Sequence, residues 1–302
     1  STGYATSGLG GGTINALTYT YSGSGTTTYA ASTTAPSAPG TYTVTPSAVG
    51  FSTGTTANYT TITYATGTLT INANALVITA NTVGPITYGS ATPTNGYTTT
   101  GLNSATTTIS VAYSYQGTGL TIYSASTTAP TAAGTYTITP VVTFTSGSAA
   151  SYSSVSYVAS NYTINKKVLT ATPQNINATY GDSSLNYSLT VTGFANSETT
   201  STAAGYVAPT CSSSNYLATT NAATAGITYS CTGGSANNYT ITNSGTGSIT
   251  IGKANLNVVP SSQTVLYGDP APTYSFSVSG FKNTDTTANS AGYVAPTCSS
   301  SY

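Results

Sequence analysis

The sequence contains very few charged residues. Only 3% of its 302 residues are Asp, Glu, Lys or Arg, divided into four acidic and four basic side chains, whereas soluble proteins average about 25%. Four Lys residues cannot neutralise a phosphate backbone, so nucleic acid is excluded as a partner. Four carboxylates are also too few for a series of calcium sites.

Histidine, methionine and tryptophan are absent as well. Without imidazole, the chain lacks the usual proton-transfer group and the usual ligand of zinc and haem. Ser and Thr are abundant, but no Gly-x-Ser-x-Gly motif stands between a strand and a helix. The glycine run at residues 10–12 has no Lys nearby to bind phosphate. We therefore predict no enzyme activity, no catalytic residue, no cofactor and no metal site.

Long hydrophobic runs are missing too. No stretch approaches the roughly 18 apolar residues of a membrane-spanning helix, so we predict no membrane insertion within this segment. The first residues, Ser1 to Tyr4, contain neither the basic nor the apolar region of a signal peptide. We expect the chain to be a mature or excised piece of a longer array.

Residues that favour strands are plentiful. Hydrophobic residues make up 38% of the chain, and 26 Tyr accompany 5 Phe. Apolar and small polar residues alternate, as in Tyr187 to Thr192, which is the pattern of a half-buried strand. This alternation favours an all-β fold over a glycosylated disordered stalk rich in Thr and Ser.

Internal repeats define the organisation of the chain. The segment 31–36 returns at 125–130, and the segment 204–214 returns unchanged at 291–301. Tyr-Gly recurs at residues 88, 180 and 267, and Asn-Tyr-Thr recurs at Asn58, Asn161 and Asn238, where we expect a turn entering the last strand. The period of about 90 residues suits a sandwich of about seven strands.

The junctions predict four repeats with short linkers. Their ranges are 1–72, 73–166, 167–252 and 253–302. Opening strands are expected at 75–79, 168–171 and 256–259. The first repeat is expected to lack its opening strands and the fourth its closing strands.

Two pairs of acidic residues occupy equivalent places. Asp182 and Glu198 lie 16 residues apart, as do Asp269 and Asp285. Such a pair could serve a glycosidase or hold a metal. Repetition in tandem favours a structural role instead, and the second repeat has Ser90 and Thr106 at these places. We expect the first Asp of each pair to accept backbone N–H bonds in its turn. The predicted structural turn residues are Gly89, Gly181, Asp182, Gly268 and Asp269.

The three cysteines predict one disulfide. Cys211 and Cys231 lie in strand-like segments, and closing the loop between them is worth about 3 kcal/mol in the chain-entropy model. A redox or metal-binding thiol pair is the alternative, although neither His nor a C-x-x-C spacing supports it. A disulfide implies an oxidising, extracellular location. Cys298 repeats Cys211, and we expect it to be unpaired, with its partner beyond Tyr302.

Two segments resemble a known family. Residues 267–285 resemble the opening half of MBG-type bacterial Ig-like repeats, and residues 225–229, 238–241 and 247–251 resemble the closing half. The resemblance implies tandem Ig-like β-sandwich domains in giant secreted surface proteins, described as adhesins or filaments. It brings no catalytic residues.

These observations predict an elongated rod of Ig-like domains. It would serve as the stalk or fibre of an extracellular bacterial adhesin-like protein, projecting or cross-linking by repeated weak contacts. One alternative is a self-assembling filament or sheath subunit, because few charges protect the sheet edges and strands could be donated between copies. Another is a carbohydrate-binding module that stacks Tyr on sugar rings. The expected partners are other copies of the chain, a cell or matrix surface, and glycans.

Overall fold

The computed structural model describes residues 3–300, and their regular structure is β. The helical turns in this range are two short 3₁₀ segments, η1 (Thr56–Asn58) and η2 (Ala149–Ser151). None of the helical segments within residues 3–300 could cross a bilayer. The predicted all-β class is confirmed.

The chain forms two compact units. The first comprises Ser1–Gly84, Pro93–Pro130 and Thr135–Tyr162, and the second comprises Pro85–Thr92, Thr131–Gly134 and Thr163–Tyr302. Two short segments of the second repeat, at 85–92 and 131–134, therefore belong with the third repeat.

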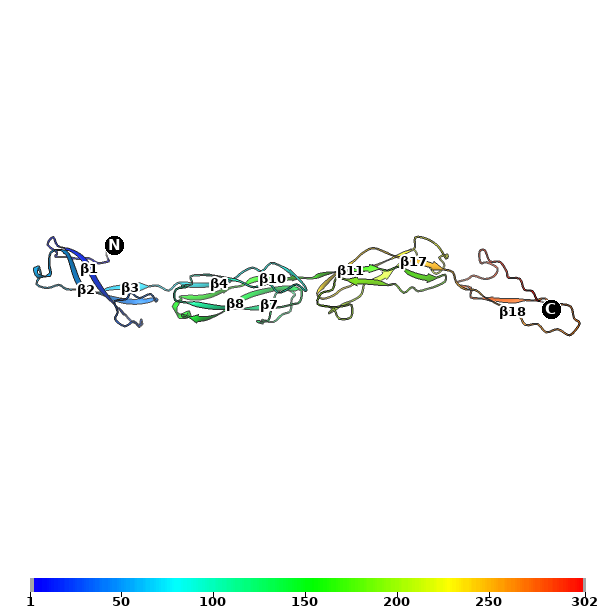
Figure 1. The fold of residues 1–302 in the computed structure, drawn as a ribbon, viewed down its shortest axis with the longest axis horizontal. Helices are drawn as coiled ribbons and strands as arrows, with labels where there is room; N and C mark the ends of the chain where they lie inside the picture. The colour runs from blue at the N-terminus through cyan, green and yellow to red at the C-terminus, as the bar shows by residue number, and fades with distance from the viewer. Residues whose placement is uncertain (1–2, 301–302) are drawn as a thin grey trace. The chain divides into compact units, whose positions relative to one another are not determined.

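The second repeat forms a three-stranded and a four-stranded sheet, with strand orders β6-β4-β9 and β5-β10-β8-β7. Its strands are β4 (Ala75–Ala80), β5 (Ile86–Thr87), β6 (Tyr97–Thr100), β7 (Thr108–Gly117), β8 (Gly134–Ser146), β9 (Ser154–Val158) and β10 (Ser160–Asn165). Figure 1 shows β7 beside β8, its antiparallel partner. The opening strand β4 pairs antiparallel with β6 and parallel with β9.

The third repeat has the same topology, with strand orders β13-β11-β16 and β12-β17-β15-β14. Its strands are β11 (Lys167–Pro173), β12 (Ile176–Thr179), β13 (Leu189–Thr192), β14 (Thr210–Ser212), β15 (Thr228–Thr232), β16 (Tyr239–Asn243) and β17 (Gly247–Gly252). Its opening strand β11 again lies between an antiparallel and a parallel neighbour. Two repeats that share little sequence thus share one pairing scheme.

The opening strand of the second and of the third repeat contributes fully buried side chains. Leu76 and Ile78 of β4 are 0% exposed, and they pack with Ile109, Val142 and Phe144 of the facing sheet. Leu169 and Ala171 of β11 are also 0% exposed. Since alternate side chains of a strand point to opposite faces, this alternation buries one face of each opening strand in a sandwich-like core.

The first and fourth repeats each show part of this scheme. The first forms one sheet of β1 (Thr13–Gly23), β2 (Gly40–Thr53) and β3 (Gly67–Ile71), which is equivalent to β7, β8 and β10. The fourth forms the pair β18 (Asn257–Pro260) and β19 (Phe276–Ser279), which is equivalent to β11 and β13.

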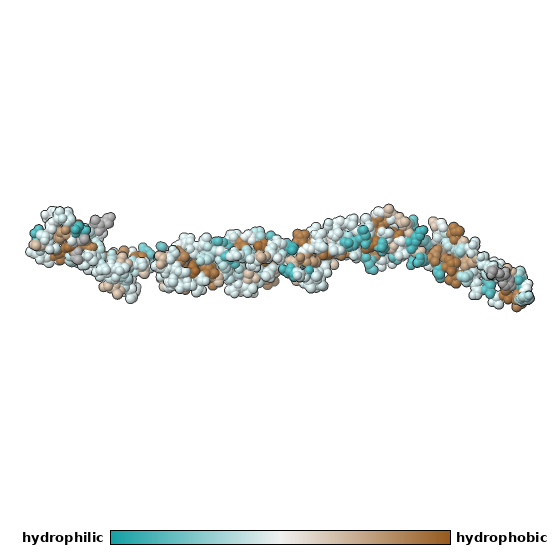
Figure 2. All heavy atoms as spheres, in the orientation of Figure 1, coloured by the Kyte–Doolittle hydropathy of each residue, from teal (hydrophilic) through white to brown (hydrophobic). Residues whose placement is uncertain are grey.

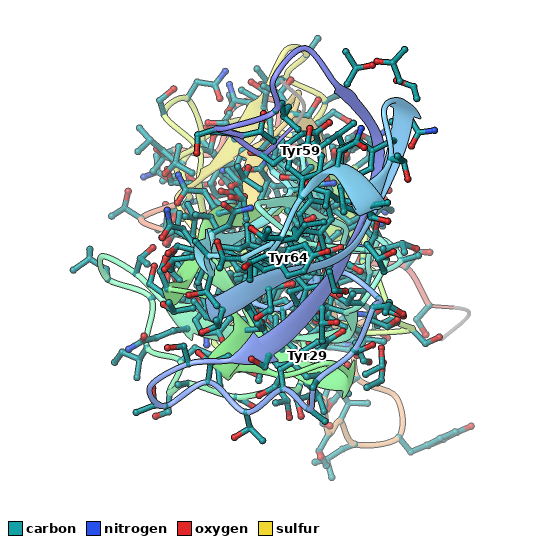
Figure 3. The ribbon with its side chains drawn as sticks, turned by 90° about the vertical axis from the view of Figure 1, so that its left-hand side faces the viewer. Tyr29, Tyr59 and Tyr64 are labelled. Carbon is teal, nitrogen blue, oxygen red and sulfur yellow. A yellow bond between two sulfur atoms is a disulfide. The ribbon has the colours of Figure 1, made fainter. Side chains whose placement is uncertain are left out.

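Tyrosine rings of the first repeat pack as separate pairs. Tyr59 stacks on Phe51, with ring centroids 5.6 Å apart, and Tyr29 meets the buried Tyr42 edge-on, also at 5.6 Å. Figure 3 shows Tyr29, Tyr59 and Tyr64 spread over this repeat rather than gathered in one cluster. The rings therefore contribute to packing at several places.

The expectation for Asn161 is wrong. Asn161 lies inside strand β10, whereas Asn58 ends η1. Asn238 precedes β16, which β17 follows, so Asn238 does not enter the last strand of its repeat either. The residue that corresponds to Tyr239 is Tyr152. Its hydroxyl accepts the N–H of Asn103, two positions after Gly101, and the Tyr239 hydroxyl accepts the N–H of Ala195, two positions after Gly193. A three-residue match carries little information in a chain rich in Asn, Tyr and Thr.

Leu169→Ala should lower the unfolding free energy of the third repeat by about 2–5 kcal/mol, because the side chain is fully buried and leaves a cavity. The matched control is Val168→Ala, at a neighbour that is 55% exposed, and should cost no more than about 0.5 kcal/mol. Hydrogen exchange of the β11 amides in denaturant measures both losses. Equal losses would contradict the assigned inward face.

Candidate functional site

The recurring Tyr-Gly pair forms a tight turn in three repeats. The N–H of the residue after Gly donates to the carbonyl of the residue before Tyr, at 2.9 Å for Ser90, 3.0 Å for Asp182 and 3.1 Å for Asp269. Gly89, Gly181 and Gly268 have φ values of +83°, +93° and +92°. A positive φ at the third position of a turn favours glycine, because other residues are strained there.

The first acid of each pair belongs to this turn. The Asp182 carboxylate accepts the N–H of Thr179 at 2.8 Å, and the Asp269 carboxylate accepts the N–H of Leu266 at 2.9 Å. Each Asp therefore adds a side-chain bond to the backbone bond of the turn. This is a local, structural use of a carboxylate.

The second acid of each pair bonds to the preceding repeat. Glu198 accepts a hydrogen bond of 3.0 Å from the hydroxyl of Tyr88, which belongs to the Tyr-Gly turn of the second repeat. Asp285 accepts one of 2.9 Å from Tyr180, in the Tyr-Gly turn of the third repeat. The two acids of a pair thus bond to different partners.

The glycines of the first two turns, Gly89 and Gly181, have a second steric role. A Cβ on Gly89 would collide with the side chain of Ala195, and a Cβ on Gly181 would collide with the side chain of Lys282. Ala195 and Lys282 both lie three residues before the second acid. The turn of one repeat therefore packs closely against the loop of the next repeat that contains the second acid. At Gly268 a Cβ would meet nothing within 4 Å.

We call each of these contacts a joint. The first joint consists of Tyr88, Gly89, Ala195, Glu198 and Tyr239, and the second consists of Tyr180, Gly181, Lys282 and Asp285. All of these residues lie in the second compact unit.

The first joint contains an additional tyrosine, and a second hydrogen bond between the second and third repeats lies near it. Tyr239 donates to Glu198, accepts the Ala195 N–H at 3.0 Å, and meets the Tyr88 ring edge-on at 5.3 Å. Nearby, the side-chain oxygen of Asn238 accepts the N–H of Ala133 at 2.9 Å. These contacts explain why residues 85–92 and 131–134 group with the third repeat.

Tyr239 is the strongly perturbed titratable group of the joint. Burial raises the pKa of its hydroxyl to about 12, and the hydrogen bond to Glu198 adds to the rise. The side chain is 2% exposed. At neutral pH the hydroxyl therefore keeps its proton and donates a hydrogen bond to the carboxylate.

The cysteines lie outside the joints. Cys211 in β14 stands directly opposite Cys231 in β15, and the two form a disulfide. Cys298 is free and exposed. Among residues 3–300, no three His, Cys, Asp or Glu residues gather as a metal site.

Sequence reasoning named the glycines and the acids but missed their tyrosine partners. Tyr88, Tyr180 and Tyr239 looked like ordinary strand or turn residues. One signal was available, because both second acids, Glu198 and Asp285, occur in repeats that follow a Tyr-Gly repeat. Tyr88 and Tyr180 lie 110 and 105 residues from their acids, and Tyr239 lies 41 residues from Glu198, so no local pattern reveals these partners.

Comparison with known proteins adds little. No family model and no curated protein matches the chain. Among solved structures, the chain is similar to three N-terminal domains of the bacteriophage RB49 Highly Immunogenic Outer Capsid protein (Hoc), with 13% identity, covering 78% of this chain and 89% of that chain. The TM-score of 0.27 is too low to carry an argument about fold or function. The resemblance to MBG-type repeats stays a prediction.

Gly89→Ala should open the first joint, whereas Gly268→Ala should not affect either joint. Both substitutions place Ala at nearly the same positive φ, which costs about 1–2 kcal/mol. Only the Gly89 variant adds a collision with Ala195. We expect faster exchange of the Ala195 and Glu198 amides in Gly89→Ala alone. Similar exchange of these two amides in both variants would show that the close approach of Gly89 to Ala195 does not stabilise the joint.

Alkaline pH should weaken the first joint through Tyr239. The folded pKa of about 12 lies above the unfolded value of about 10, so the stabilisation is complete below about pH 10 and is lost as the pH rises through about 12. Tyr239→Phe lacks this titration. The stability gap between wild type and variant should therefore narrow by about 2 kcal/mol from near pH 9 to pH 12 in urea denaturation. A constant gap would contradict the raised pKa.

Proposed function

We propose that this chain is the stalk or fibre region of an extracellular bacterial adhesin-like surface protein. In this proposal its repeats are Ig-like sandwiches in an elongated rod that carries or cross-links partners by repeated weak contacts. The disulfide between Cys211 and Cys231 supports an oxidising, extracellular location.

The observation that carries the proposal is the recurrence of the joint. Tyr88 with Glu198 and Tyr180 with Asp285 use the same turn, the same loop and the same chemistry at successive repeat junctions. A single such contact could be incidental. Its repetition supports a role in limiting the bending between neighbours, which a projecting stalk requires.

The surface also suits a passive spacer. Figure 2 shows mostly pale residues of weak polarity on the face in view, as expected where Thr, Ser, Gly and Tyr predominate. A surface of this kind offers many similar weak contacts and no strongly charged patch. Affinity along such an array would come from the number of contacts rather than the strength of one.

Removing the joint hydroxyls tests this role. The double variant Tyr88→Phe with Tyr180→Phe keeps both rings but removes the donors to Glu198 and Asp285. In electron micrographs, wild-type particles should be straight rods with a narrow distribution of end-to-end length, and the double variant should bend. The matched control is Tyr216→Phe, because that hydroxyl donates to the backbone carbonyl of Asp182 within its own repeat, at 2.9 Å.

Control particles should resemble the wild type. Wild-type particles that are compact or freely bent would contradict the stalk proposal.

A display experiment then tests projection from a cell surface. Placed between a cell-surface anchor and a sugar-binding head, the wild-type chain should support adhesion through a polysaccharide coat better than the double variant. Equal adhesion would contradict a role in projection.

A further inference from the structure

The second repeat has a long strand at the edge of its four-stranded sheet. Strand β7 comes last in the order β5-β10-β8-β7, and its side away from β8 pairs with no regular strand within residues 3–300. Its residues, 108–117, include neither a charged side chain nor proline. Charges and proline are common means by which an edge strand avoids pairing with another chain. Strand β7 lacks both.

One bridge shows which backbone groups of β7 face away from β8. Tyr115 donates its N–H to the Ser126 carbonyl at 2.7 Å and accepts the Ser126 N–H at 3.0 Å. Backbone groups of a strand alternate in direction, so those of Ile109, Val111 and Tyr113 also face outward. The described part of the chain, residues 3–300, forms no hydrogen bond to these outward groups. The open edge therefore runs from residue 109 to residue 113.

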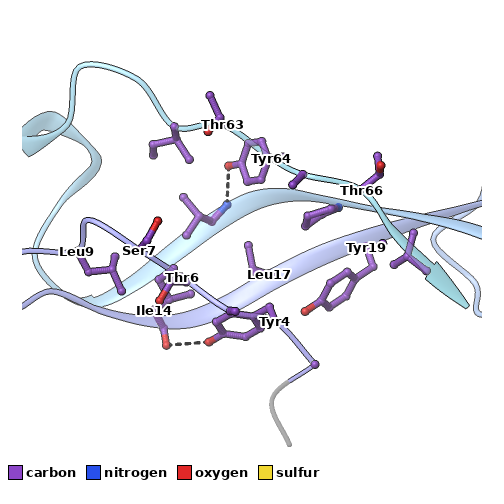
Figure 4. Close-up of a pocket in the computed structure, with 18 of the residues that line it drawn as sticks. Tyr4, Thr6, Ser7, Leu9, Ile14, Leu17, Tyr19, Thr63, Tyr64 and Thr66 are labelled. Atoms are coloured by element: carbon purple, nitrogen blue, oxygen red, sulfur yellow. Dashed lines mark hydrogen bonds between the residues drawn. The ribbon is translucent and has the colours of Figure 1, made fainter.

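The equivalent edges of the neighbouring repeats are arranged differently. In the third repeat the equivalent strand is β14, which has only three residues. In the first repeat the equivalent strand is β1, and the hydroxyl of Tyr4 donates to its Ile14 carbonyl at 3.4 Å (Figure 4). Short strands and covering segments both protect a sheet edge. The edge of β7 has neither form of protection.

The open edge is complementary to itself. When two copies of β7 are placed antiparallel with Val111 opposite Val111, Ile109 of one copy lies opposite Tyr113 of the other. The residues of each such pair turn both backbone groups toward one another, so each pair can exchange two hydrogen bonds. A β-branched residue opposite an aromatic one is also a favourable cross-strand pair.

The exposed face of the strand allows this register. Ser110 and Ala112 are exposed, and Ser110 of one copy lies opposite Ala112 of the other. Side chains approach closely at such a position, and these two are small. A shift by two residues would place an outward residue opposite Tyr115, whose groups already bond Ser126, or at Thr107, before the strand begins. The register centred on Val111 therefore uses the whole open edge.

Charge is compatible with pairing between two copies. Residues 1–165 contain no Asp, Glu, Lys or Arg. Two β7 edges can therefore meet without repulsion between like charges and without desolvation of an ion. A charged peptide would find no opposite charge in this part of the chain, so the sequence favours an uncharged strand as the partner.

We propose that β7 of one copy pairs antiparallel with β7 of a second copy, with Val111 opposite Val111. The pairing joins two four-stranded sheets edge to edge by strand addition. Its two-fold symmetry closes the assembly at two copies, because each edge is used once. This inference goes beyond the stalk, which needs no contact between copies, and it uses none of the residues of the joints.

Sedimentation velocity tests the inference on the full chain. All proteins carry Cys298→Ser, so that the exposed thiol cannot link two copies. The sedimentation coefficient of this parent should rise with protein concentration and level off at the value of a dimer. Ser110→Lys combined with Ala112→Lys should abolish the rise, because each new Lys faces a Lys of the other copy.

The matched control adds the same charge elsewhere in the second repeat. Thr98→Lys combined with Thr100→Lys changes two exposed residues of β6, which lies in the other sheet. This variant should associate as the parent does. Loss of association in the control as well would show that added charge alone prevents it, and would contradict an assignment to β7.

A charge-complementation experiment tests the register. Ser110→Glu combined with Ala112→Glu should be monomeric by itself, as the double Lys variant is. An equal mixture of the two should form heterodimers, because the register places each Lys opposite a Glu. High salt should weaken these heterodimers, since the charges are exposed. Restored association would also show that β7 is folded in both variants.

Three results would overturn the inference. A parent chain that stays monomeric at every concentration would show that the edge does not pair. Association that survives the double Lys variant would assign it to another surface, such as the exposed loop residues Leu120 and Ile122. Failure of the mixture to associate would contradict the register centred on Val111. Each result would leave the stalk proposal standing, since that proposal rests on the joints.

Discussion

The hydrogen bond from a tyrosine hydroxyl of one repeat to a carboxylate of the next is the interaction on which the account depends. Tyr88 bonds Glu198, and Tyr180 bonds Asp285, in both cases beside a glycine that allows close approach. A bond to an ionised acceptor is about twice as strong as a neutral one. The chain has four acids. Two are used in these joints, and the other two close the Tyr-Gly turns.

The small number of charged side chains also affects the rest of the molecule. Hydroxyl groups provide much of the polar bonding, and the buried Tyr229 shows how, because its ring packs against Tyr187 while its hydroxyl bonds the backbone of Gln174 and Ser188. Charged side chains are also the usual protection of sheet edges against pairing with other chains. A chain that lacks them must cover its sheet edges in another way or pair them.

Local sequence pattern predicted the local structure well. Alternation predicted the all-β class and opening strands at 75–79, 168–171 and 256–259, and the structure forms β4, β11 and β18 there. The bond from Asp182 to its own turn could also be expected, because it spans three residues. The tyrosine partners of Glu198 and Asp285 could not be predicted, because the nearest lies 41 residues away and the others more than 100. The prediction for Asn161 failed for a different reason. The recurring triplet Asn-Tyr-Thr was assigned to a turn, but Asn161 lies in a strand.

A double-mutant cycle at the second joint tests the central claim most directly. Tyr180→Phe, Asp285→Asn and the double variant are compared with the wild type by the free energy of opening of the Asp285 amide, which bonds the Lys282 carbonyl at 3.0 Å. If the hydroxyl and the carboxylate hold the joint together, the two substitutions should be non-additive by about 1 kcal/mol or more. Additive effects would show that Tyr180 and Asp285 act independently, and the joint would then lose its physical basis.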